Sequence, residues 1–598
     1  MRLVGAVLGV LIAAVLLAPA AARALEVPYE VKIAGVEDRR LLDTLRAVSR
    51  LIADRERPPP TVPALRRRAD ADRALLEEAL ASFGYYGAAV TYRIDRDATP
   101  VQVLLTVALG EPYGLARYDV AWRDPAPAAG AIDTSLAGLG LEAGMAAESG
   151  AIVAAERQLL AVLARRGHPL AAVLDRKVVV DHAARTVVVD LAVDAGPFAR
   201  FGAVAIEGLD SVHEDFVRSQ LPWLADDPFD RDQVEAGRRA LIRTGLFASV
   251  TIAEAPSVGP DGRLPLTLTA VEAKHRSLGA GANYSTSEGF GGKLFWEHRN
   301  LLHAGERLEV TGFGGQTVFG AATSFRKPTF LGPRNSLLLD GQFTQEDREG
   351  FDSRTAGASA GIERNFTDTI AAGAGALAEW SRIDEDGKED TFTLVGAPLS
   401  LRRDTTDDLL DPARGGRSTL GVTPYASVAG PPVQFVVGRL TQTAYLSPLE
   451  DDSLVLAGWG RIGSIFGEDT EDIPATKRLY GGGGGSVRAY GFQMLGPLDR
   501  DKDPSGGRSQ LELGAELRHR FSEDSGILED VGLVAFFEGG NVYDDRLPDL
   551  TENLLWGGGF GVRYFTGIGP VRLDVAFPLN GRPADDPFQI YISLGQAF

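Results

Sequence analysis

The chain contains no cysteine among its 598 residues. It can therefore form neither a disulfide nor a thiolate metal site, and its stability must come from packing and hydrogen bonding. Its seven histidines are scattered, and no two of them have the H-E-x-x-H spacing of a zinc enzyme. We therefore expect no metal site and no cofactor.

Positive charge is also scarce. Lys and Arg number 61 against 81 Asp and Glu, which gives a formal net charge of −20. Proteins that bind nucleic acid or an anionic membrane surface carry basic patches, because those partners are negatively charged. The composition argues against both partners and is typical of a protein that stays soluble in the periplasm and at the cell surface.

Long apolar runs are absent beyond the N-terminus. Residues 1–24 have the pattern of a cleaved secretory signal: Arg2 supplies positive charge, an apolar stretch follows, and small residues offer two cleavage sites, one ending at Ala22 and one at Ala24. No later segment has the roughly 18 consecutive apolar residues of a transmembrane helix. Two classes remain, a soluble exported protein and a closed β-barrel, whose strands satisfy their backbone groups within a membrane.

The first half of the chain repeats one pattern three times. Each copy has a strand, helices with apolar residues at helical spacing, a turn containing glycine, and then two β-rich runs. The period is about 80 residues, which is longer than a solenoid repeat. We predict three α+β modules, at residues 26–110, 113–196 and 199–273.

Residues 277–598 have almost no helical signal, and many short segments alternate between apolar and polar residues. Val571, Leu573 and Val575, for example, alternate with polar neighbours. This alternation fits a lipid-facing exterior and a wet lumen. A soluble sandwich would show the same alternation, but the signal sequence and the room for about 16 strands favour a transmembrane antiparallel β-barrel.

A closed barrel joins its first strand to its last, and both are weak in this sequence. We expect the first near Leu278–Thr286 and the last near Phe588–Phe598, with its final residue in the lipid-facing register. Glycine weakens a strand because it packs nothing and resists ordering. We therefore predict fewer paired residues at this lateral seam than between other neighbours. The residues expected there are Gly279, Gly281, Gly595 and Phe598.

A run of five glycines precedes the most informative motif. It is no phosphate-binding loop, because it lacks the Gly-Lys-Ser/Thr ending and a following helix. The motif itself comprises Val487, Arg488, Ala489, Tyr490, Gly491 and Phe492. It resembles the V-R-G-[FY] motif of the BamA/TamA superfamily, with Ala489 at the first glycine position. The resemblance implies that a long extracellular loop, the sixth, folds into the lumen and is pinned there by Arg488.

An arginine inside a lumen requires an acidic partner, because an unpaired buried charge is costly. The segment Phe537-Glu538-Gly539 resembles a later strand motif of the same superfamily. Alternation places Phe537 outward and Glu538 inward. We therefore predict an ion pair between Arg488 and Glu538. The alternative is that Glu538 is one of many solvated acids in the lumen.

The third repeat, from its opening strand at Phe201 to its Gly245-Leu246-Phe247 turn, resembles a POTRA module. Three such modules before a barrel are most similar to TamA-type members of the superfamily. That resemblance implies an outer-membrane location in a Gram-negative bacterium, with the modules in the periplasm and a TamB-like periplasmic protein as partner. It also implies insertion of autotransporters and other barrel proteins into the lipid bilayer, by opening of the seam.

Other functions remain open at this stage. A dedicated secretion pore, a passive channel and a role in phospholipid transport are all compatible with a barrel. A barrel enzyme would need a converging Ser/His or Asp/His set, which the sequence does not reveal, so we expect no catalytic residues.

Overall fold

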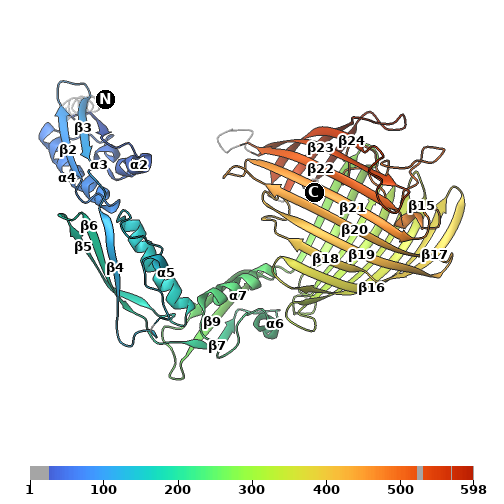
Figure 1. Cartoon of the computed structure of the whole chain (residues 1–598), viewed down its shortest axis with the longest axis horizontal. Helices are drawn as coiled ribbons and strands as arrows, with labels where there is room; N and C mark the ends of the chain where they lie inside the picture. The colour runs from blue at the N-terminus through green and yellow to red at the C-terminus, as the bar shows by residue number, and fades with distance from the viewer. Residues whose placement is uncertain (1–25, 129, 522–529, 568, 595, 597–598) are drawn as a thin grey trace, which may run out of the picture. The chain divides into compact units, whose positions relative to one another are not determined.

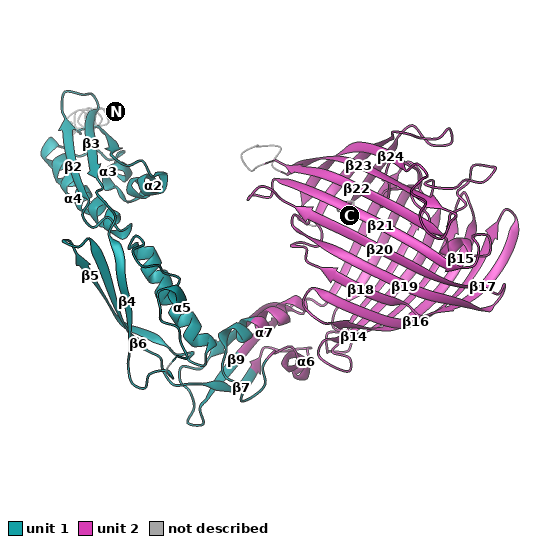
Figure 2. Ribbon diagram, in the orientation of Figure 1, with its two compact units in different colours: residues 1–205, 223–235, 252–267 teal, residues 206–222, 236–251, 268–598 magenta. Residues whose placement is uncertain are grey.

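The computed structural model describes residues 26–128, 130–521, 530–567, 569–594 and 596. The expected signal sequence therefore lies outside the described residues, as do Gly595 and Phe598. In the described part, strands form three small sheets and one closed barrel (Figure 1). None of its helices is long and apolar enough to cross a membrane. The chain groups into two compact units that divide the third small sheet between them (Figure 2).

The first module packs helices against a three-stranded sheet. Its helices begin after the capping side chains of Asp38, Ser49 and Thr61, each of which accepts a backbone N–H. Leucines on the inner helix faces then pack against alternate residues of the central strand. Its elements are β1 (Tyr29–Ala34), α2 (Arg39–Val48), α3 (Arg50–Ala53), α4 (Val62–Ser82), β2 (Ala89–Asp95) and β3 (Val101–Ala108).

The second module contains β4 (Gly114–Trp122), η1 (Ala137–Leu139), α5 (Ser149–Arg165), β5 (Ala172–Asp181) and β6 (Thr186–Asp194). The third contains β7 (Arg200–Glu207), α6 (Glu214–Ser219), α7 (Arg231–Arg243), β8 (Phe247–Glu254) and β9 (Arg263–Glu272). All three sheets place the last strand of the module in the middle, in the orders β1-β3-β2, β4-β6-β5 and β7-β9-β8. The repeat seen in the sequence is therefore a repeat of one topology.

The second module corrects one expectation, because its described residues contain a single α-helix where helices were predicted. Only the short 3-10 helix η1 precedes α5. The connecting stretch contains Pro125 and Pro127, and Gly140 lies at φ +72° just after η1. Proline and glycine both oppose a continuous helix there.

The barrel is antiparallel and closes on itself. Its strands are β10 (Arg276–Ser285), β11 (Gly289–His298), β12 (Arg307–Gly315), β13 (Val318–Pro328), β14 (Asn335–Asp347), β15 (Asp352–Asn365), β16 (Ile370–Glu385), β17 (Lys388–Gly396), β18 (Leu399–Asp404), β19 (Gly415–Ala429), β20 (Gln434–Leu446), β21 (Leu454–Gly467), β22 (Ser509–Arg520), β23 (Val531–Tyr543), β24 (Leu555–Thr566), β25 (Gly569–Pro578) and β26 (Gln589–Leu594).

Two of these strands are halves of one. Both β17 and β18 pair with β16 on one side and with β19 on the other. They are separated at Ala397-Pro398, where the proline has no N–H to donate to a ladder. The described barrel therefore has 16 strands, which confirms the predicted number and class.

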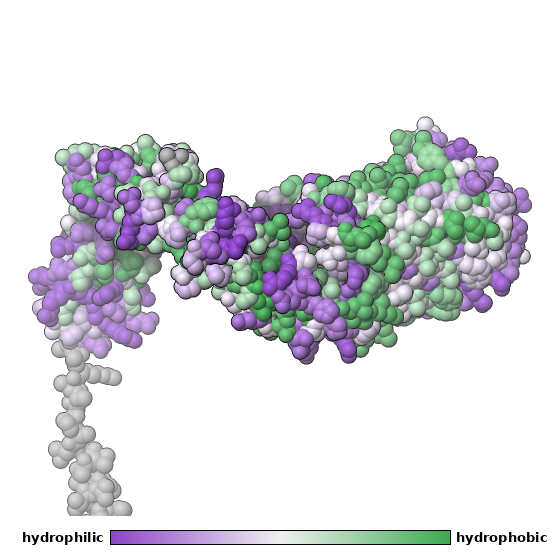
Figure 3. All heavy atoms as spheres, turned by 90° about the horizontal axis from the view of Figure 1, so that it is seen from below, coloured by the Kyte–Doolittle hydropathy of each residue, from purple (hydrophilic) through white to green (hydrophobic). Residues whose placement is uncertain are grey.

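The wall has the two faces that alternation predicts. On β23, Leu533 and Phe537 are about half exposed, while Phe536 and Glu538 between and beside them are buried. Figure 3 shows apolar residues over much of the barrel wall on the face seen there. The apolar face therefore points outward and the polar face lines the lumen.

The end of the third module is attached to the barrel through Glu272, the last residue of β9. One oxygen of Glu272 accepts the backbone N–H groups of Asp210, Ser211 and Val212 at 2.8–2.9 Å, and the other accepts the Ser211 hydroxyl at 2.7 Å. The buried Asn300, in the turn between β11 and β12, donates to the same Ser211. One small cluster thus ties the loop before α6 to the turn between β11 and β12.

We predict that this attachment depends on the charge of Glu272. Burial raises the pKa of Glu272, but the hydrogen bonds from Ser211 and the backbone outweigh it and lower the pKa from 4.5 to about 2. Because folding lowers the pKa of this carboxyl group, its ionised form stabilises the folded state fully at pH values above the unfolded pKa of 4.5. This stabilisation is lost as the pH falls toward the folded pKa of about 2. Amide exchange at residues 210–212, relative to intrinsic rates, should stay slow at pH 4 and become fast at every pH in Glu272→Gln. Equal protection in both proteins would show that the carboxylate does not hold this loop.

Candidate functional site: a lumen segment and a short seam

The site is built on residues 468–508, which join β21 to β22. Strand β21 runs in the same direction as β10, since barrel strands alternate and β17 and β18 count as one. The segment therefore leaves the barrel at the end where β10 and β21 finish, opposite to the end at which β10 begins. It does not stay outside, because its residues pack on the inner faces of β23, β24 and β25. The residues of this apolar contact are Val487, Ala489, Tyr490, Leu495, Val534, Phe536, Leu555 and Ala576.

Arg488 is fully buried at the centre of this contact. Its guanidinium donates to Glu538 at 2.6 and 3.0 Å, and its backbone N–H donates to the second oxygen of Glu538 at 2.9 Å. The guanidinium also lies over the ring of Phe536, 3.5 Å from the centroid. The structure thus brings Arg488 and Glu538 together, and Glu538 is no solvated lumen acid.

Two further acids that the sequence did not single out complete the site. Glu516 of β22 lies 2.6 Å from Arg488, and Asp574 of β25 lies 2.8 Å from it. Both acids are buried and pair with further arginines of the wall, Arg518 and Arg563. Both lie on the polar face of a strand with alternating residues, so the sequence predicts that they point into the lumen. It does not predict that they lie close to Arg488. Arg488 therefore ties three strands of the wall to one point of the segment.

Ala489, which replaces the first glycine of the motif, is accommodated by a glycine elsewhere. A Cβ placed on Gly557 of β24 would lie 2.1 Å from the Cβ of Ala489, far inside van der Waals contact. The methyl group of Ala489 thus occupies space that is free because Gly557 has no side chain. The departure from the motif leaves the docking of Arg488 intact.

We predict that Gly557→Ala displaces the segment and that Ala489→Gly suppresses the defect. Overpacking in a well-packed contact costs about 1–3 kcal/mol, and the second change removes the methyl group that causes the clash. Protease sensitivity of residues 468–508 should increase in the single variant and return to the wild-type level in the double variant. Equal sensitivity of both variants would mean that Ala489 and Gly557 do not meet.

The remaining motif residues lead from the segment to the last strand. The hydroxyl of Tyr490 donates to the backbone oxygen of Trp556 at 3.1 Å, and the Tyr591 hydroxyl of β26 donates to the backbone oxygen of Tyr490 at 3.4 Å. Phe492 stacks under Arg348, whose guanidinium carbon is 4.3 Å from the ring centroid. The segment therefore supports the wall up to the strand that closes the barrel.

Among the described residues, the ladder that closes the barrel is short. Strands β10 and β26 form two residue pairs, whereas β10 forms ten with β11, and β26 forms six with β25. Within the described residues, the edge of β10 from 276 to 283 has no strand partner on the seam side. The two pairs, at the end where β10 finishes, are Tyr284 with Ile592 and Ser285 with Tyr591.

The two glycines of β10 do not act as the sequence suggested. Both belong to a complete ladder with β11. A Cβ on Gly279 would lie 2.3 Å from the ring of Phe295, and one on Gly281 would lie 3.1 Å from Lys293. They make room for side chains of the neighbouring strand. Among the described residues, the pairing of β26 with β10 stops at Ile592, although β26 pairs with β25 as far as Leu594.

No group of three or more His, Asp or Glu side chains in the described ranges is arranged to hold a metal ion. The described site consists of a buried network of ion pairs around Arg488 and, beside it, an edge of β10 that has no strand partner among the described residues.

Comparison with known proteins identifies the class. Residues 300–598 match the family model of the Omp85 superfamily domain, and residues 30–109 match that of the first POTRA domain of TamA. The first match covers half of the chain, and the chain belongs to the Omp85 superfamily. The predicted membership in the BamA/TamA group is confirmed, and the chain is an outer-membrane protein whose N-terminal POTRA modules lie in the periplasm.

Individual relatives are distant. The outer membrane protein assembly factor BamA of Neisseria meningitidis serogroup B is 23% identical over 471 residues, which are 69% of this chain and 58% of the relative. BamA of Nitratidesulfovibrio vulgaris is 25% identical over 414 residues, which are 66% of this chain and 51% of that relative. The chain thus spans little more than half the length of these relatives.

A solved structure shares the fold. It is BamA from Haemophilus ducreyi lacking POTRA domains 1–3, which superposes with a TM-score of 0.64 at 16% identity and covers 81% of this chain and all of its own.

Proposed function

We propose that this protein assembles or translocates other outer-membrane proteins and that it does so at the seam between β10 and β26. The observation that carries the proposal is that, within the part of the chain that the structure describes, β10 and β26 share two residue pairs. Unpaired backbone groups in lipid cost several kcal/mol each, so a free strand edge is a strong template for another strand. A client strand that adds to β10 would satisfy those groups by β-augmentation.

The lumen segment supports the same function. It holds the wall that ends in β26 through Arg488 and Tyr490, so the strand beside the seam is braced while the seam itself is short. Beyond β26, the side-chain amide of Gln596 contacts Arg563 of the lumen wall and Asp411, not β10. A passive channel needs neither a braced wall nor a short seam. The protein acts without bond chemistry, as a template.

The finer proposal is a TamA-like role. The match of the first module to a TamA POTRA domain and the three repeated sheets support it. In that role the modules receive client barrel proteins, autotransporters among them, and bind a TamB-like periplasmic partner. The relatives that carry the name assembly factor support the broader role.

Site-specific crosslinking of a client tests the proposal. The chain has no cysteine, so Ala280→Cys on the free edge of β10 carries the sole thiol. The matched control is Ala358→Cys, an exposed alanine of β15, which is paired on both sides. We expect a client barrel with one cysteine in its last strand to form a disulfide with position 280 and not with 358. Equal crosslinking at both positions would contradict the proposed site of action.

A further inference from the structure

The lumen segment has a second attachment, on a different part of the wall. Lys477, at the end of η2 (Ala475–Lys477), lies 2.6 Å from Glu379 of β16. The next residue, Arg478, places both terminal nitrogens on the two oxygens of Glu385, one of them at 2.8 Å, and its Nε donates to the backbone oxygen of Ile473. Glu379 and Arg478 are both buried. The Lys477–Glu379 pair is thus mostly shielded from solvent, whereas the Arg478–Glu385 pair lies at the end of β16, where the side chain of Glu385 is one-third exposed.

An apolar cluster accompanies the two cations. The segment contributes Ile473, Ala475 and Leu479, each almost fully buried. Their partners are lumen-facing residues of β16, β17, β20 and β21: Ile383, Phe392, Leu394, Phe435 and Ile465. Polar and apolar contacts thus fix residues 473–479 to this side of the barrel.

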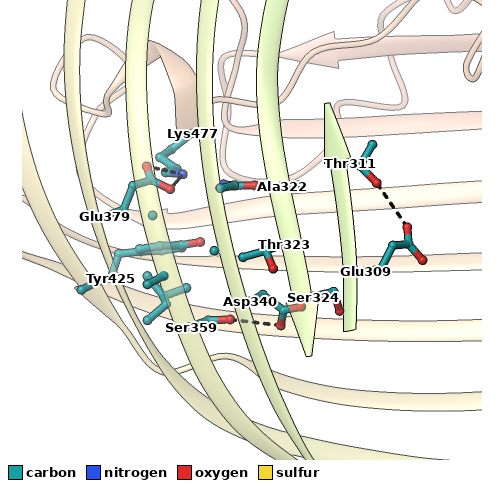
Figure 4. A pocket seen from close by; sticks show the side chains of 16 residues that line it. Glu309, Thr311, Ala322, Thr323, Ser324, Asp340, Ser359, Glu379, Tyr425 and Lys477 are labelled. Carbon is teal, nitrogen blue, oxygen red and sulfur yellow. Dashed lines mark hydrogen bonds and ion pairs between the residues drawn. The ribbon is translucent and has the colours of Figure 1, made fainter. Parts of the chain in front are cut away.

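The two attachments lie on separate parts of the wall. Residues 473–479 are fixed to β16–β21, and residues 487–495 are fixed to β23–β25, which lead to the seam. Between them the segment stays on the wall at β22, where Gln510 donates to the backbone oxygen of Tyr480 at 3.3 Å and Ser486 donates to Glu512 at 2.6 Å. Figure 4 shows Lys477 reaching Glu379 above Tyr425, at the border of a cavity of about 470 Å³ whose other lining residues come mostly from the consecutive strands β12 to β16. Beside Lys477 the lumen is open, so the ion pair marks where the segment begins to fill it.

We propose that Lys477 and Arg478 form a second anchor that holds the segment in the lumen and thereby positions Arg488 against its three acids. They are positioning residues, because neither touches Arg488 or the seam strands. A segment held at one point can swing out when that contact breaks, whereas one held at two points returns to its place. The inference rests on the proposed function, since it concerns the brace of the seam.

The test measures whether the segment stays in the lumen, without using a client. Val487 is fully buried, so Val487→Cys places the sole thiol of the chain where a membrane-impermeant maleimide cannot reach it. In Lys477→Met with Arg478→Met, we expect labelling in intact cells to be roughly tenfold faster or more, as the loss of buried ion pairs predicts. The matched control is Arg500→Met, which removes an exposed cation of the same segment and should leave labelling unchanged.

A charge exchange separates anchoring from general damage. Lys477→Glu alone should speed labelling, and adding Glu379→Lys should restore protection, because the pair is re-formed with its signs reversed. Unchanged labelling in the double methionine variant, with a folded barrel shown by heat-dependent gel mobility, would overturn the anchor, whatever the assembly activity. Failure of the charge exchange to restore protection would overturn it as well. If the double methionine variant is labelled faster but still assembles clients fully, the anchor is supported. The role of the segment in the proposed function is then contradicted.

Discussion

Arg488→Ala is expected to release the lumen segment and to abolish most client assembly while the amount of folded barrel stays near the wild-type level. The substitution leaves Glu516, Glu538 and Asp574 without their shared cation. Removing one partner of a buried ion pair costs about 3–5 kcal/mol. That loss falls on the docking of one segment and not on the ladders of the 16 strands, so the barrel itself should persist.

Client assembly in cells, barrel content in outer membranes and protease sensitivity of residues 468–508 measure the three parts of this prediction. Arg488→Lys is the informative control, because it keeps the charge but loses the fork that reaches three carboxylates. We expect it to be intermediate in both assembly and sensitivity. Loss of barrel content in parallel with activity would assign Arg488 to folding alone, and full activity of Arg488→Ala would remove the segment from the mechanism.

Alternation was sufficient to predict much of this molecule. A period of two fixes which face each residue occupies, so the inward direction of Glu538 followed from the outward direction of Phe537. The strand number followed from the length of the alternating region. The break between β17 and β18 did not change it, because both halves keep the same neighbours.

Contacts across the lumen were not predictable in the same way. Alternation shows that Glu516 and Asp574 point inward, but it does not give the register that places them both within 3 Å of Arg488. The pairs of Lys477 with Glu379 and of Arg478 with Glu385 join residues more than 90 positions apart. Such pairs depend on the path of an irregular segment, for which sequence periodicity carries no information.

The glycines show a second limit. Gly279 suggested a weak strand, yet its missing side chain is matched by Phe295 of the neighbouring strand. The same holds for Gly557 and Ala489. A glycine in a strand indicates either weak packing or the close approach of another residue. The sequence alone does not distinguish the two, because the neighbouring residue in the fold is not known from it.

A disulfide across the seam tests the central claim most directly. Tyr284 and Ile592 are register partners, and directly opposed Cα atoms lie within the range that a disulfide spans. Tyr284→Cys with Ile592→Cys should therefore lock the seam in a chain that has no other thiol. The matched control, Leu573→Cys with Ile592→Cys, joins the same residue to β25 instead of β10.

We expect the oxidised seam variant to lose client assembly, to regain it on reduction, and to keep a folded barrel in both states. The β25 control should assemble clients in both states. If the oxidised seam variant assembles clients as fast as its reduced form, with the crosslink complete, the seam does not open during function and the account of lateral insertion is wrong.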